Sequence, residues 1–366
     1  MWQGCAAVCL TRLQCGRNVR RGGIIGNTHL SKVFITGSAG FIGYHLARKL
    51  LDDGFQVHGY DGMTDYYDVA LKRRRHAMLL QHPNFAATEA MLGDLAVLDR
   101  VSEVFQPDVI IHLAAQAGVR YSLEEPRSYV ESNVIGTFNV LEVARRLGVT
   151  HLLIASTSSV YGANASLPFR ETDRADEPLT IYAATKKAGE AMAHSYAHLW
   201  NIPTTMFRFF TVYGTWGRPD LAYFKFVDAI LKDAPIDVYN HGEMWRDFTA
   251  VDDLVQAVRL LIDVVPVRPQ PGEVIAEGDS LSPQAPFRVV NIGNSEKVHL
   301  MEFIATIEAV LGRKALCNFL PMQQGDAPAT WADASLLKRL TGYQPGTPLR
   351  EGMTQFVAWY RDYYGR

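Results

Sequence analysis

The segment Lys32-Val33-Phe34-Ile35-Thr36-Gly37-Ser38-Ala39-Gly40-Phe41-Ile42-Gly43 joins a strand signal directly to a helix signal. Its first five residues are rich in β-branched and aromatic side chains, and the residues after Gly40 continue as an apolar-periodic helix through Leu51. Glycines at this spacing permit a tight turn and let the backbone approach a pyrophosphate, whose charge the helix N-terminus attracts. The segment therefore predicts a dinucleotide site made by Gly37, Ala39, Gly40, Phe41, Ile42 and Gly43.

A carboxylate follows the next strand signal. Gln56–Tyr60 is expected to be a strand, and Asp61 ends it. At this place a carboxylate accepts hydrogen bonds from both hydroxyls of the adenosine ribose, and it would repel a phosphate on that ribose. Asp61 therefore favours NAD over NADP, although an aspartate at the end of a strand is also a common turn residue.

Short β-branched runs alternate with amphipathic stretches from Ser31 onward, which is the pattern of a parallel sheet covered by helices. Further strands are expected at Val109–Ala114, His151–Ala155 and Thr204–Phe209. We therefore predict an α/β fold, a Rossmann-type doubly wound parallel sheet with a smaller C-terminal α/β substrate lobe.

The alternation stops after Gly214, which suggests where the lobes divide. We expect residues 31–210 to form the NAD-binding domain, with 246–265 returning to it. Residues 211–245 and 266–366 are assigned to the substrate lobe. The many prolines and glycines from Pro266 to Pro286 indicate a surface loop.

Composition limits the classes of function. The 366 residues are 48% hydrophobic and 20% charged, with a formal net charge of −2, so no nucleic-acid partner is expected. The short basic run Lys72–Arg75 is interpreted as a solvated helix face. No segment approaches the roughly 18 to 20 continuous apolar residues of a membrane span, so no membrane partner is expected. No His, Cys and carboxylate cluster has the spacing of a metal site.

Residues 1–30 differ from the rest of the chain, because they contain arginines and no Asp or Glu. We expect them to form a disordered leader outside the fold. They also hold Cys5, Cys9 and Cys15, and only Cys317 lies elsewhere. So few cysteines make no disulfide framework for a chain of this length, which favours a reducing, cytoplasmic location.

Tyr182-Ala183-Ala184-Thr185-Lys186 lies in a helical stretch, and residues four apart share one helix face. An ammonium beside a phenol favours the phenolate, so we expect the pKa of Tyr182 to fall below its usual value of about 10. Tyr182 is then a candidate base. By itself the pair would more often be a solvated surface pair, and only the glycine turn makes the catalytic interpretation the better one.

Four hydroxyl residues, Ser156-Thr157-Ser158-Ser159, follow the apolar strand that ends at Ala155. Ligands of open α/β sheets bind beyond the carboxyl ends of the strands. The hydroxyls are therefore candidate substrate ligands, the alternative being a turn in which they satisfy their own backbone.

These motifs together resemble the extended short-chain dehydrogenases/reductases of the nucleotide-sugar epimerase and dehydratase group, over essentially Ser31 to Arg366. Further matches are Gly93-Asp94-Leu95, His112-Leu113-Ala114-Ala115 and Ser132-Asn133-Val134. The resemblance implies that Asp94 and Leu95 lie near the adenine, and that Ala114, Ala115, Asn133, Tyr182 and Lys186 lie along a tightly bound, recycled NAD.

In this group phenolate Tyr182 takes the proton of the sugar 4-hydroxyl while C4 gives its hydride to NAD, and Thr157 bonds the same oxygen. Dehydratases carry an Asp-Glu pair after that threonine, and decarboxylases carry a glutamate where this chain has Ser159. Ser158 and Ser159 therefore disfavour both reactions and leave inversion at C4.

The stretch Arg208 to Ala222, with Thr211 and Arg218, closely resembles the uronic acid 4-epimerases. The resemblance implies that UDP-glucuronate is converted to UDP-galacturonate, in nucleotide-sugar metabolism that supplies polysaccharide biosynthesis. Thr157, Ser158, Ser159 and Thr211 offer neutral donors to the substrate carboxylate, and Arg218 can close over it.

For the nucleotide, Arg246 is the candidate diphosphate ligand, because a guanidinium matches phosphate oxygens, and Asp326 the candidate ribose ligand. A surface ion pair of Arg246 with Asp247 or Glu243 is the alternative. Homodimerisation through about Pro126–Leu147 and Leu179–Trp200 is implied by the group alone. UDP-glucuronate decarboxylase, UDP-glucose 4-epimerase and a non-catalytic NAD-binding regulator remain as alternative functions.

Overall fold

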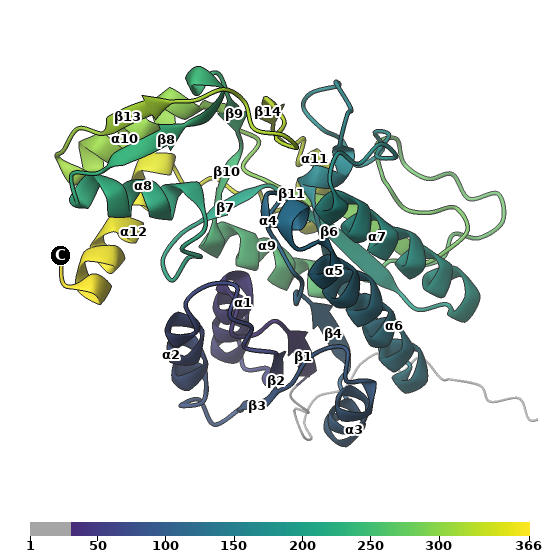
Figure 1. Cartoon of the computed structure of the whole chain (residues 1–366). Coiled ribbons are helices and arrows are strands. Elements are labelled where there is room, and N and C mark those ends of the chain that lie inside the picture. Colours follow the sequence, from purple (N-terminus) through teal and green to yellow (C-terminus); the bar gives the residue numbers. More distant parts are fainter. Residues whose placement is uncertain (1–30) are drawn as a thin grey trace, which may run out of the picture.

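The computed structural model describes residues 31–366, and the leader predicted for residues 1–30 lies outside the described residues. The chain folds around a seven-stranded parallel sheet in the order β11-β6-β5-β4-β1-β2-β3 (Figure 1). The order from β3 to β6 is that of a doubly wound dinucleotide-binding sheet, so the predicted fold class is confirmed. The strands are β1 (Lys32–Thr36), β2 (Gln56–Asp61), β3 (Phe85–Glu89), β4 (Val109–His112), β5 (His151–Thr157), β6 (Thr204–Phe209) and β11 (Phe287–Ile292).

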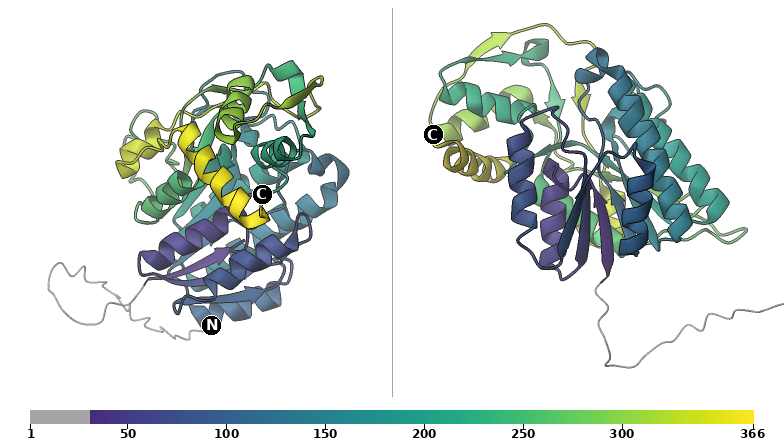
Figure 2. Two further views of the ribbon diagram at one scale, coloured as in Figure 1. Left: turned by 90° about the vertical axis from the view of Figure 1, so that its left-hand side faces the viewer. Right: turned by 60° about the horizontal axis from the view of Figure 1, so that its bottom comes forward.

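Helices cover both faces of this sheet (Figure 2). Side chains alternate between the faces of a strand, so Val33 and Ile35 pack with α1 and α9, whereas Phe34 packs in a second core with α6. One face carries α1 (Phe41–Asp52), α2 (Val69–Leu79), α9 (Val251–Ile262) and α11 (Ser335–Thr341); the other carries α3 (Leu95–Phe105), α6 (Gly136–Leu147) and α7 (Ile181–Trp200). Two short helices, α4 (Tyr121–Glu124) and α5 (Pro126–Tyr129), and a π-helical turn, Val130–Ile135, lead into α6.

A smaller lobe lies beyond the carboxyl ends of the sheet strands (Figure 1). Its own core contains Phe226, Phe248, Phe303 and Phe356, all buried. It is built from α8 (Ala222–Leu231), α10 (Leu300–Leu311), α12 (Leu349–Tyr364), β8 (Pro235–Val238) and β13 (Leu316–Phe319). Short strands join it to the sheet: β7 (Thr211–Tyr213), β9 (Trp245–Arg246), β10 (Phe248–Ala250), β12 (Val298–His299) and β14 (Ala329–Thr330), with 3-10 turns at Ser158–Tyr161 and Tyr239–Gly242.

The strand predictions differ from the structure at particular places. β4 ends at His112 rather than Ala114, and β5 continues to Thr157. β3 was not predicted, because only Phe85 of its five residues is buried. β11 was not predicted either, since Arg288 interrupts its apolar run; this arginine is buried and pairs with Asp279 at 3.0 Å.

β11 pairs with β6 in the large sheet, although it falls inside the range 266–366 that the sequence assigns to the substrate lobe. We propose the same division into two lobes, except that Phe287–Ile292 is assigned to the NAD-binding domain. The return of 246–265 agrees with the position of α9, whose apolar residues join the sheet core. Pro266 to Pro286 contains neither helix nor strand.

The basic run Lys72–Arg75 is not a solvated face, so that interpretation is wrong for two of its members. Arg73 and Arg74 are exposed, whereas Lys72 and Arg75 are buried. Lys72 Nζ donates to the Thr64 carbonyl at 2.5 Å, and Arg75 is held by carbonyl groups. An exposed and a buried basic residue of a helix look the same in a sequence. Only the packing of α2 shows which of the four are buried.

Within residues 31–366, no helix has both the length and the apolar composition needed to cross a bilayer. The same residues contain no group of three His, Cys, Asp or Glu side chains arranged to hold a metal ion.

Candidate active site

A large cleft opens at the carboxyl ends of β1, β2, β4 and β5, and residues of the smaller lobe line its other side. Its volume is about 1330 Å³, above the range of about 300 to 1000 Å³ usual for a single ligand. The cleft therefore has room for a dinucleotide and a second ligand. Its lining includes Gly37, Gly40–Gly43, Asp61, Tyr66, Leu92, Gly93, Ala114–Gln116, Thr157–Ser159, Tyr182, Lys186, Thr211, Arg218, Asp220, Arg246 and Asp326.

The glycine turn is built so that only glycine fits at two positions. Gly37 has φ +78°, and a Cβ there would lie 2.7 Å from the Ala114 nitrogen. A Cβ on Gly43 would lie 2.0 Å from the Gly37 carbonyl oxygen. The turn therefore packs against both the end of β4 and the start of α1, and leaves the N-terminus of α1 facing the cleft. This cradle fits the pyrophosphate of a dinucleotide.

Asp61 connects the turn to the end of β2. Its carboxylate accepts hydrogen bonds from the backbone N–H groups of Ala39 and Met63, both at 2.9 Å. It is nearly buried and lines the cleft. Each oxygen keeps a free lone pair, so the carboxylate can brace the turn and still accept from a ribose. The turn role and the ribose role are thus compatible.

Three residues implied for the cofactor do not line the cleft. Asp94 is exposed and caps α3 by accepting from the Val97 N–H at 3.1 Å, with Leu95 beside it. Leu92 and Gly93 line the cleft in their place. Asn133 is buried beneath it: its amide exchanges hydrogen bonds with the Gln116 backbone at 2.8 and 3.0 Å.

Asn133 also donates to the Thr185 hydroxyl at 3.1 Å and so fastens the Gln116 loop to α7. We therefore assign it a positioning role. Ala39 is likewise fully buried in the turn itself. The structure brings the remaining predicted cofactor residues, Ala114, Ala115, Tyr182 and Lys186 included, to the cleft.

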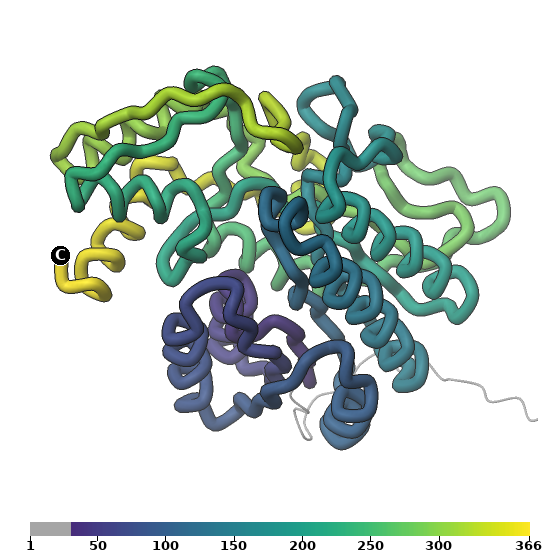
Figure 3. Tube along the Cα trace, viewed as in Figure 1, coloured from purple at the N-terminus to yellow at the C-terminus, as the bar shows by residue number. Residues whose placement is uncertain are grey.

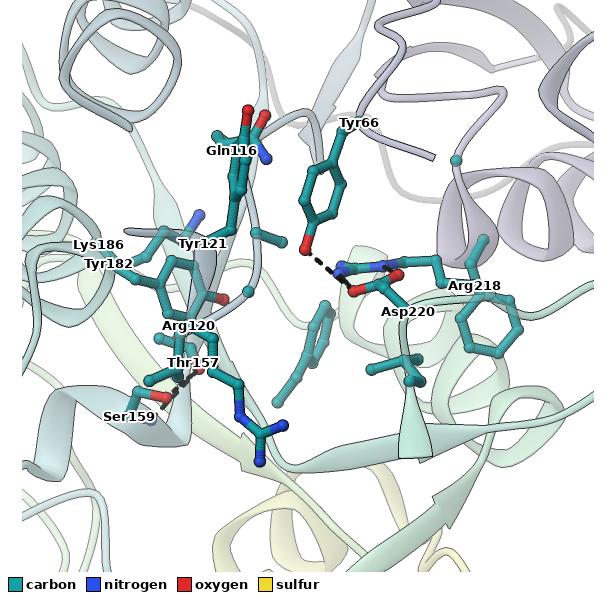
Figure 4. Close-up of a pocket in the computed structure, with 18 of the residues that line it drawn as sticks. Tyr66, Gln116, Arg120, Tyr121, Thr157, Ser159, Tyr182, Lys186, Arg218 and Asp220 are labelled. Atoms are coloured by element: carbon teal, nitrogen blue, oxygen red, sulfur yellow. Dashed lines mark hydrogen bonds and ion pairs between the residues drawn. The ribbon is translucent and has the colours of Figure 1, made fainter. Parts of the chain in front are cut away.

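One side of the cleft, here called the tyrosine wall, consists of Thr157, Ser159, Tyr182 and Lys186 (Figure 4). Thr180 caps α7 by accepting from the Ala183 N–H at 3.2 Å, which fixes where the helix begins. Tyr182 and Lys186 then fall on one face, as predicted from their spacing. One turn further, Glu190 is buried and pairs with Arg208 of β6 at 2.9 Å.

The electrostatics of this wall correct one expectation. Burial raises the pKa of Tyr182, although the Thr157 hydroxyl and the Arg218 charge oppose the shift. Burial also lowers the pKa of Lys186 to about 8, against the attraction of Glu190. The predicted depression of the Tyr182 pKa is therefore wrong for the protein alone, because desolvation outweighs the Thr157 hydrogen bond and the Arg218 charge.

The hydroxyls after β5 serve two purposes. Ser156 donates its hydroxyl hydrogen to Glu190 at 2.7 Å, which occupies it within the protein. Thr157 accepts from the Ser159 N–H at 3.2 Å and so caps the turn that follows. Ser158, Ser159 and Thr211 are half-buried and line the cleft. The turn interpretation therefore holds for part of the group and leaves three hydroxyls open to a ligand.

The opposite side, here called the arginine wall, consists of Tyr66, Arg218 and Asp220 (Figure 4). Arg218 donates to both oxygens of Asp220, at 3.0 and 2.5 Å, and Tyr66 donates to Asp220 at 3.2 Å. Burial opposes the charge of Asp220, but Arg218 lowers its pKa. Arg218 is thus held in the cleft by its Nε and Nη2, which both bond to an acid of the protein.

At the end of the cleft nearest the smaller lobe, Arg246 and Asp326 lie close to Arg120. Arg246 donates to the carbonyl groups of Trp245 and Pro328, at 2.8 and 3.4 Å, and burial lowers its pKa. The proposed ion pair with Asp247 or Glu243 is not formed. Asp326 instead accepts from Arg120 at 3.3 Å.

Several cleft residues were not singled out from the sequence. Nothing in the spacing of Tyr66, Gln116, Arg120 and Tyr121 indicated a site, yet all four line the cleft (Figure 4). Asp220 lies two residues from Arg218, and this close spacing of opposite charges is a signal that could have indicated it.

The sequence model of the NAD dependent epimerase/dehydratase family matches residues 33–275, more than half of the chain. A probable UDP-glucuronate 4-epimerase of Rhizobium meliloti (strain 1021) is 56% identical over 92% of this chain and 98% of that protein. UDP-glucuronate 4-epimerase 2 of Arabidopsis thaliana is 43% identical over 91% and 76%, respectively.

Among solved structures, UDP-glucuronic acid 4-epimerase from Bacillus cereus, in complex with UDP-glucuronic acid and NAD, matches with a TM-score of 0.80. It is 30% identical, and the match covers 91% of this chain and 100% of that one. The glycine turn, the Tyr182 and Lys186 pair and these matches agree: the chain belongs to the NAD dependent epimerase/dehydratase family.

Proposed function

We propose that the protein is an NAD-dependent enzyme that inverts C4 of UDP-glucuronate to give UDP-galacturonate through a 4-keto intermediate. One observation carries the proposal: the tyrosine wall and the arginine wall face each other across a cleft that begins at the glycine turn (Figure 4). A proton acceptor, a dinucleotide cradle and a cation for a carboxylate thus meet in one place. The relatives named UDP-glucuronate 4-epimerase support the same reaction.

The tyrosine wall handles the proton of the sugar. When bound in the cleft, NAD would supply the hydride acceptor for C4 and an added positive charge. Because burial raises the pKa of Tyr182 in the protein alone, it needs such added positive charge to act as a base near neutrality. Tyr182 takes the proton of the 4-hydroxyl, Thr157 donates to the same oxygen, and Lys186 stabilises the phenolate.

The second half of the reaction reverses the first. The 4-keto sugar would present its opposite face, the bound cofactor would supply the hydride that returns to C4, and Tyr182 would give the proton back to the 4-oxygen. Since the hydride returns to carbon, no net oxidation occurs, and the enzyme needs no second redox partner. NAD is therefore recycled in the site.

The carboxylate of the substrate is read by neutral and charged donors. Ser158, Ser159 and Thr211 supply hydroxyls that line the cleft, and Arg218 supplies a guanidinium. Charge-assisted hydrogen bonds are stronger than neutral ones, so this set favours a uronate over a neutral hexose. Arg246 and Arg120 serve the diphosphate, and Asp326 serves the uridine ribose.

The function is tested with purified protein and separate incubations with UDP-glucuronate, UDP-glucose and UDP-N-acetylglucosamine, without added NAD. Products are resolved by chromatography and NMR. We expect UDP-glucuronate alone to be converted efficiently, with UDP-galacturonate as product and no accumulation of NADH. UDP-pentose as the main product would make the protein a decarboxylase, and action on the neutral sugars alone would contradict the carboxylate site.

We also propose that the protein is a cytoplasmic homodimer that supplies a precursor of polysaccharides. Support for a dimer comes from apolar side chains that are exposed on neighbouring helices: Ile135, Phe138, Ile181, Leu199 and Trp200. Scattered exposed apolar residues are normal, but a group on α6 and α7 fits a partner surface. Light scattering after size exclusion should give a mass of twice the chain, and a monomeric mass would reject the dimer.

A further inference from the structure

Arg75 is the largest fully buried side chain of the described residues, and all four of its partners are uncharged oxygens. Its Nη1 donates to the Ala39 carbonyl at 3.0 Å and to the Tyr67 phenol at 2.8 Å. Its Nη2 donates to the carbonyls of Trp216 and Gly217, at 2.6 and 3.0 Å. Burial raises the pKa of Tyr67, so that partner is a neutral phenol.

These partners lie in different parts of the chain. Ala39 belongs to the glycine turn, whereas Trp216 and Gly217 immediately precede Arg218. Figure 3 shows the chain after β7 descending from the smaller lobe toward α1 and α2 before it enters α8. His45 of α1 donates from Nε2 to the Thr215 carbonyl at 2.8 Å. Three consecutive carbonyls, 215 to 217, are thus held by two helices of the NAD-binding domain.

The backbone of the 215–217 segment has an unfavourable conformation. Trp216 has φ +54°, a left-handed conformation that costs a bulky residue free energy. A Cβ on Gly217 would lie 1.8 Å from the Tyr223 hydroxyl oxygen. Because such a conformation persists only when its surroundings impose it, the hydrogen bonds from Arg75 fix the course of the chain into Arg218.

A buried cation without a carboxylate is costly, since desolvation disfavours the charge. A fork with several fixed donors can bind carbonyls of two loops at once, which a shorter neutral side chain cannot do. We propose that Arg75 is a positioning residue for substrate recognition: it ties the glycine turn to the 215–217 segment and so sets Arg218 for the substrate carboxylate. This inference rests on the proposed function.

The proposal is tested by a double-mutant cycle on binding. Arg75→Gln, Arg218→Gln and the double variant are made in the Tyr182→Phe background, where turnover is blocked, and each is brought to full NAD content. Calorimetry then gives the Kd of UDP-glucuronate and of UDP. We expect Arg75→Gln to weaken UDP-glucuronate by about tenfold or more, because a small misplacement of a clamp is costly, and to change UDP by less than about twofold.

The decisive result is the coupling. If Arg75 acts through Arg218, the double variant binds UDP-glucuronate within about twofold of Arg218→Gln alone. If the two losses of affinity for UDP-glucuronate multiply in the double variant, the proposal is overturned, because a purely structural defect at Arg75 would act independently of Arg218. If Arg75→Gln does not fold, Arg75→Lys keeps the charge but loses the fork, and the same comparison applies to it.

A matched control lies on the same helix. Arg73 is exposed and pairs with Glu89 at 3.2 Å, so Arg73→Gln should leave both dissociation constants unchanged. Conversion of UDP-glucuronate by the unmutated enzyme separates the two claims. If it does not convert UDP-glucuronate, the proposed function fails; if it converts it and the losses multiply, only the role of Arg75 fails.

Discussion

The two walls of the cleft are assembled in different ways. The tyrosine wall comes from β5, the 3-10 turn that directly follows it, and α7, so its residues lie on elements of regular geometry. The arginine wall joins Tyr66 to Asp220 across 154 positions of sequence, and both lie in loops. The residues proposed for proton transfer thus lie on rigid elements, whereas those proposed for carboxylate recognition depend on contacts between distant loops.

The walls also differ in charge. On the tyrosine wall Lys186 is desolvated, and its pKa falls to about 8 because burial disfavours the ammonium. On the arginine wall Arg218 keeps its charge and is paired with Asp220. We expect changes on the first wall to affect turnover, and changes on the second wall to affect the choice of substrate.

The largest effect is expected from Tyr182→Phe, which removes the phenol oxygen and keeps the ring. The kcat for UDP-glucuronate should fall by about 10³-fold, in the range of a lost general base, while the Kd of UDP-glucuronate changes little. Tyr343→Phe is the control, since its hydroxyl bonds to Asp253 at 2.7 Å outside the cleft. Retention of more than about a tenth of the activity would remove Tyr182 from the proposed role.

Arg218→Gln tests the arginine wall. A charge-assisted bond contributes about 1.5 to 3 kcal/mol, so kcat/KM for UDP-glucuronate should fall about 10- to 100-fold. Any activity with UDP-glucose should fall much less, because that sugar has no carboxylate. Steady-state kinetics on both sugars decide the matter, and an equal loss on both would show that Arg218 does not read the carboxylate.

His112→Asn examines the support under the tyrosine wall. His112 is buried between the hydroxyls of Thr36 and Thr137, at 2.7 and 3.0 Å, and burial lowers its pKa to about 3. The unfolded chain binds this proton near pH 6.5, so the folded state loses stability as the pH falls from 6.5 toward 3. The loss is about 1.4 kcal/mol per pH unit for one such group.

His58 and His151 change the stability with pH in the same direction, because burial lowers the pKa of each to about 4. Urea unfolding at a series of pH values between 6.5 and 4 should therefore give a steep dependence in the unmutated protein. The dependence should be shallower in His112→Asn by about 1.4 kcal/mol per pH unit. Equal slopes for the two proteins would show that His112 is protonated in the folded state.

The smallest effect is expected from Thr211→Val, which keeps the shape and removes one donor. The 4-keto uronate is a β-keto acid, and it loses carbon dioxide when the C5–C6 bond aligns with the ketone, the electron pair passing into an enol that then takes a proton. One hydrogen bond fewer should raise the share of UDP-pentose about threefold to tenfold. Thr354→Val, on the exposed side of α12, is the control. An unchanged share of UDP-pentose in Thr211→Val would show that the Thr211 hydroxyl does not hold the carboxylate out of that alignment.

The same comparison explains what the sequence could predict. The glycine turn and the face shared by Tyr182 and Lys186 follow from local spacing, so they were found. Strand β11 was not predicted, because its apolar run contains Arg288, a charged residue that is paired inside the fold. Tyr66 reaches Asp220, and Arg75 reaches residues 216 and 217, only through tertiary contacts, which no sequence periodicity indicates.

Burial was the second source of error. The sequence shows an ammonium near Tyr182 but does not show how deeply both groups lie, and desolvation sets the direction of both pKa shifts. Arg75 was misjudged for the same reason, because its acceptors at positions 39, 216 and 217 are carbonyl groups that carry no side-chain signal.

The central claim is that the hydride leaves C4 and returns to the same carbon from the other side. UDP-glucuronate carrying deuterium at C4 tests it directly in the enzyme as purified, with unlabelled NADH present in solution as a trap. The account predicts UDP-galacturonate that retains deuterium at C4 and no deuterium in the NADH pool. UDP-galacturonate without the label, or a UDP-pentose in its place, would contradict it.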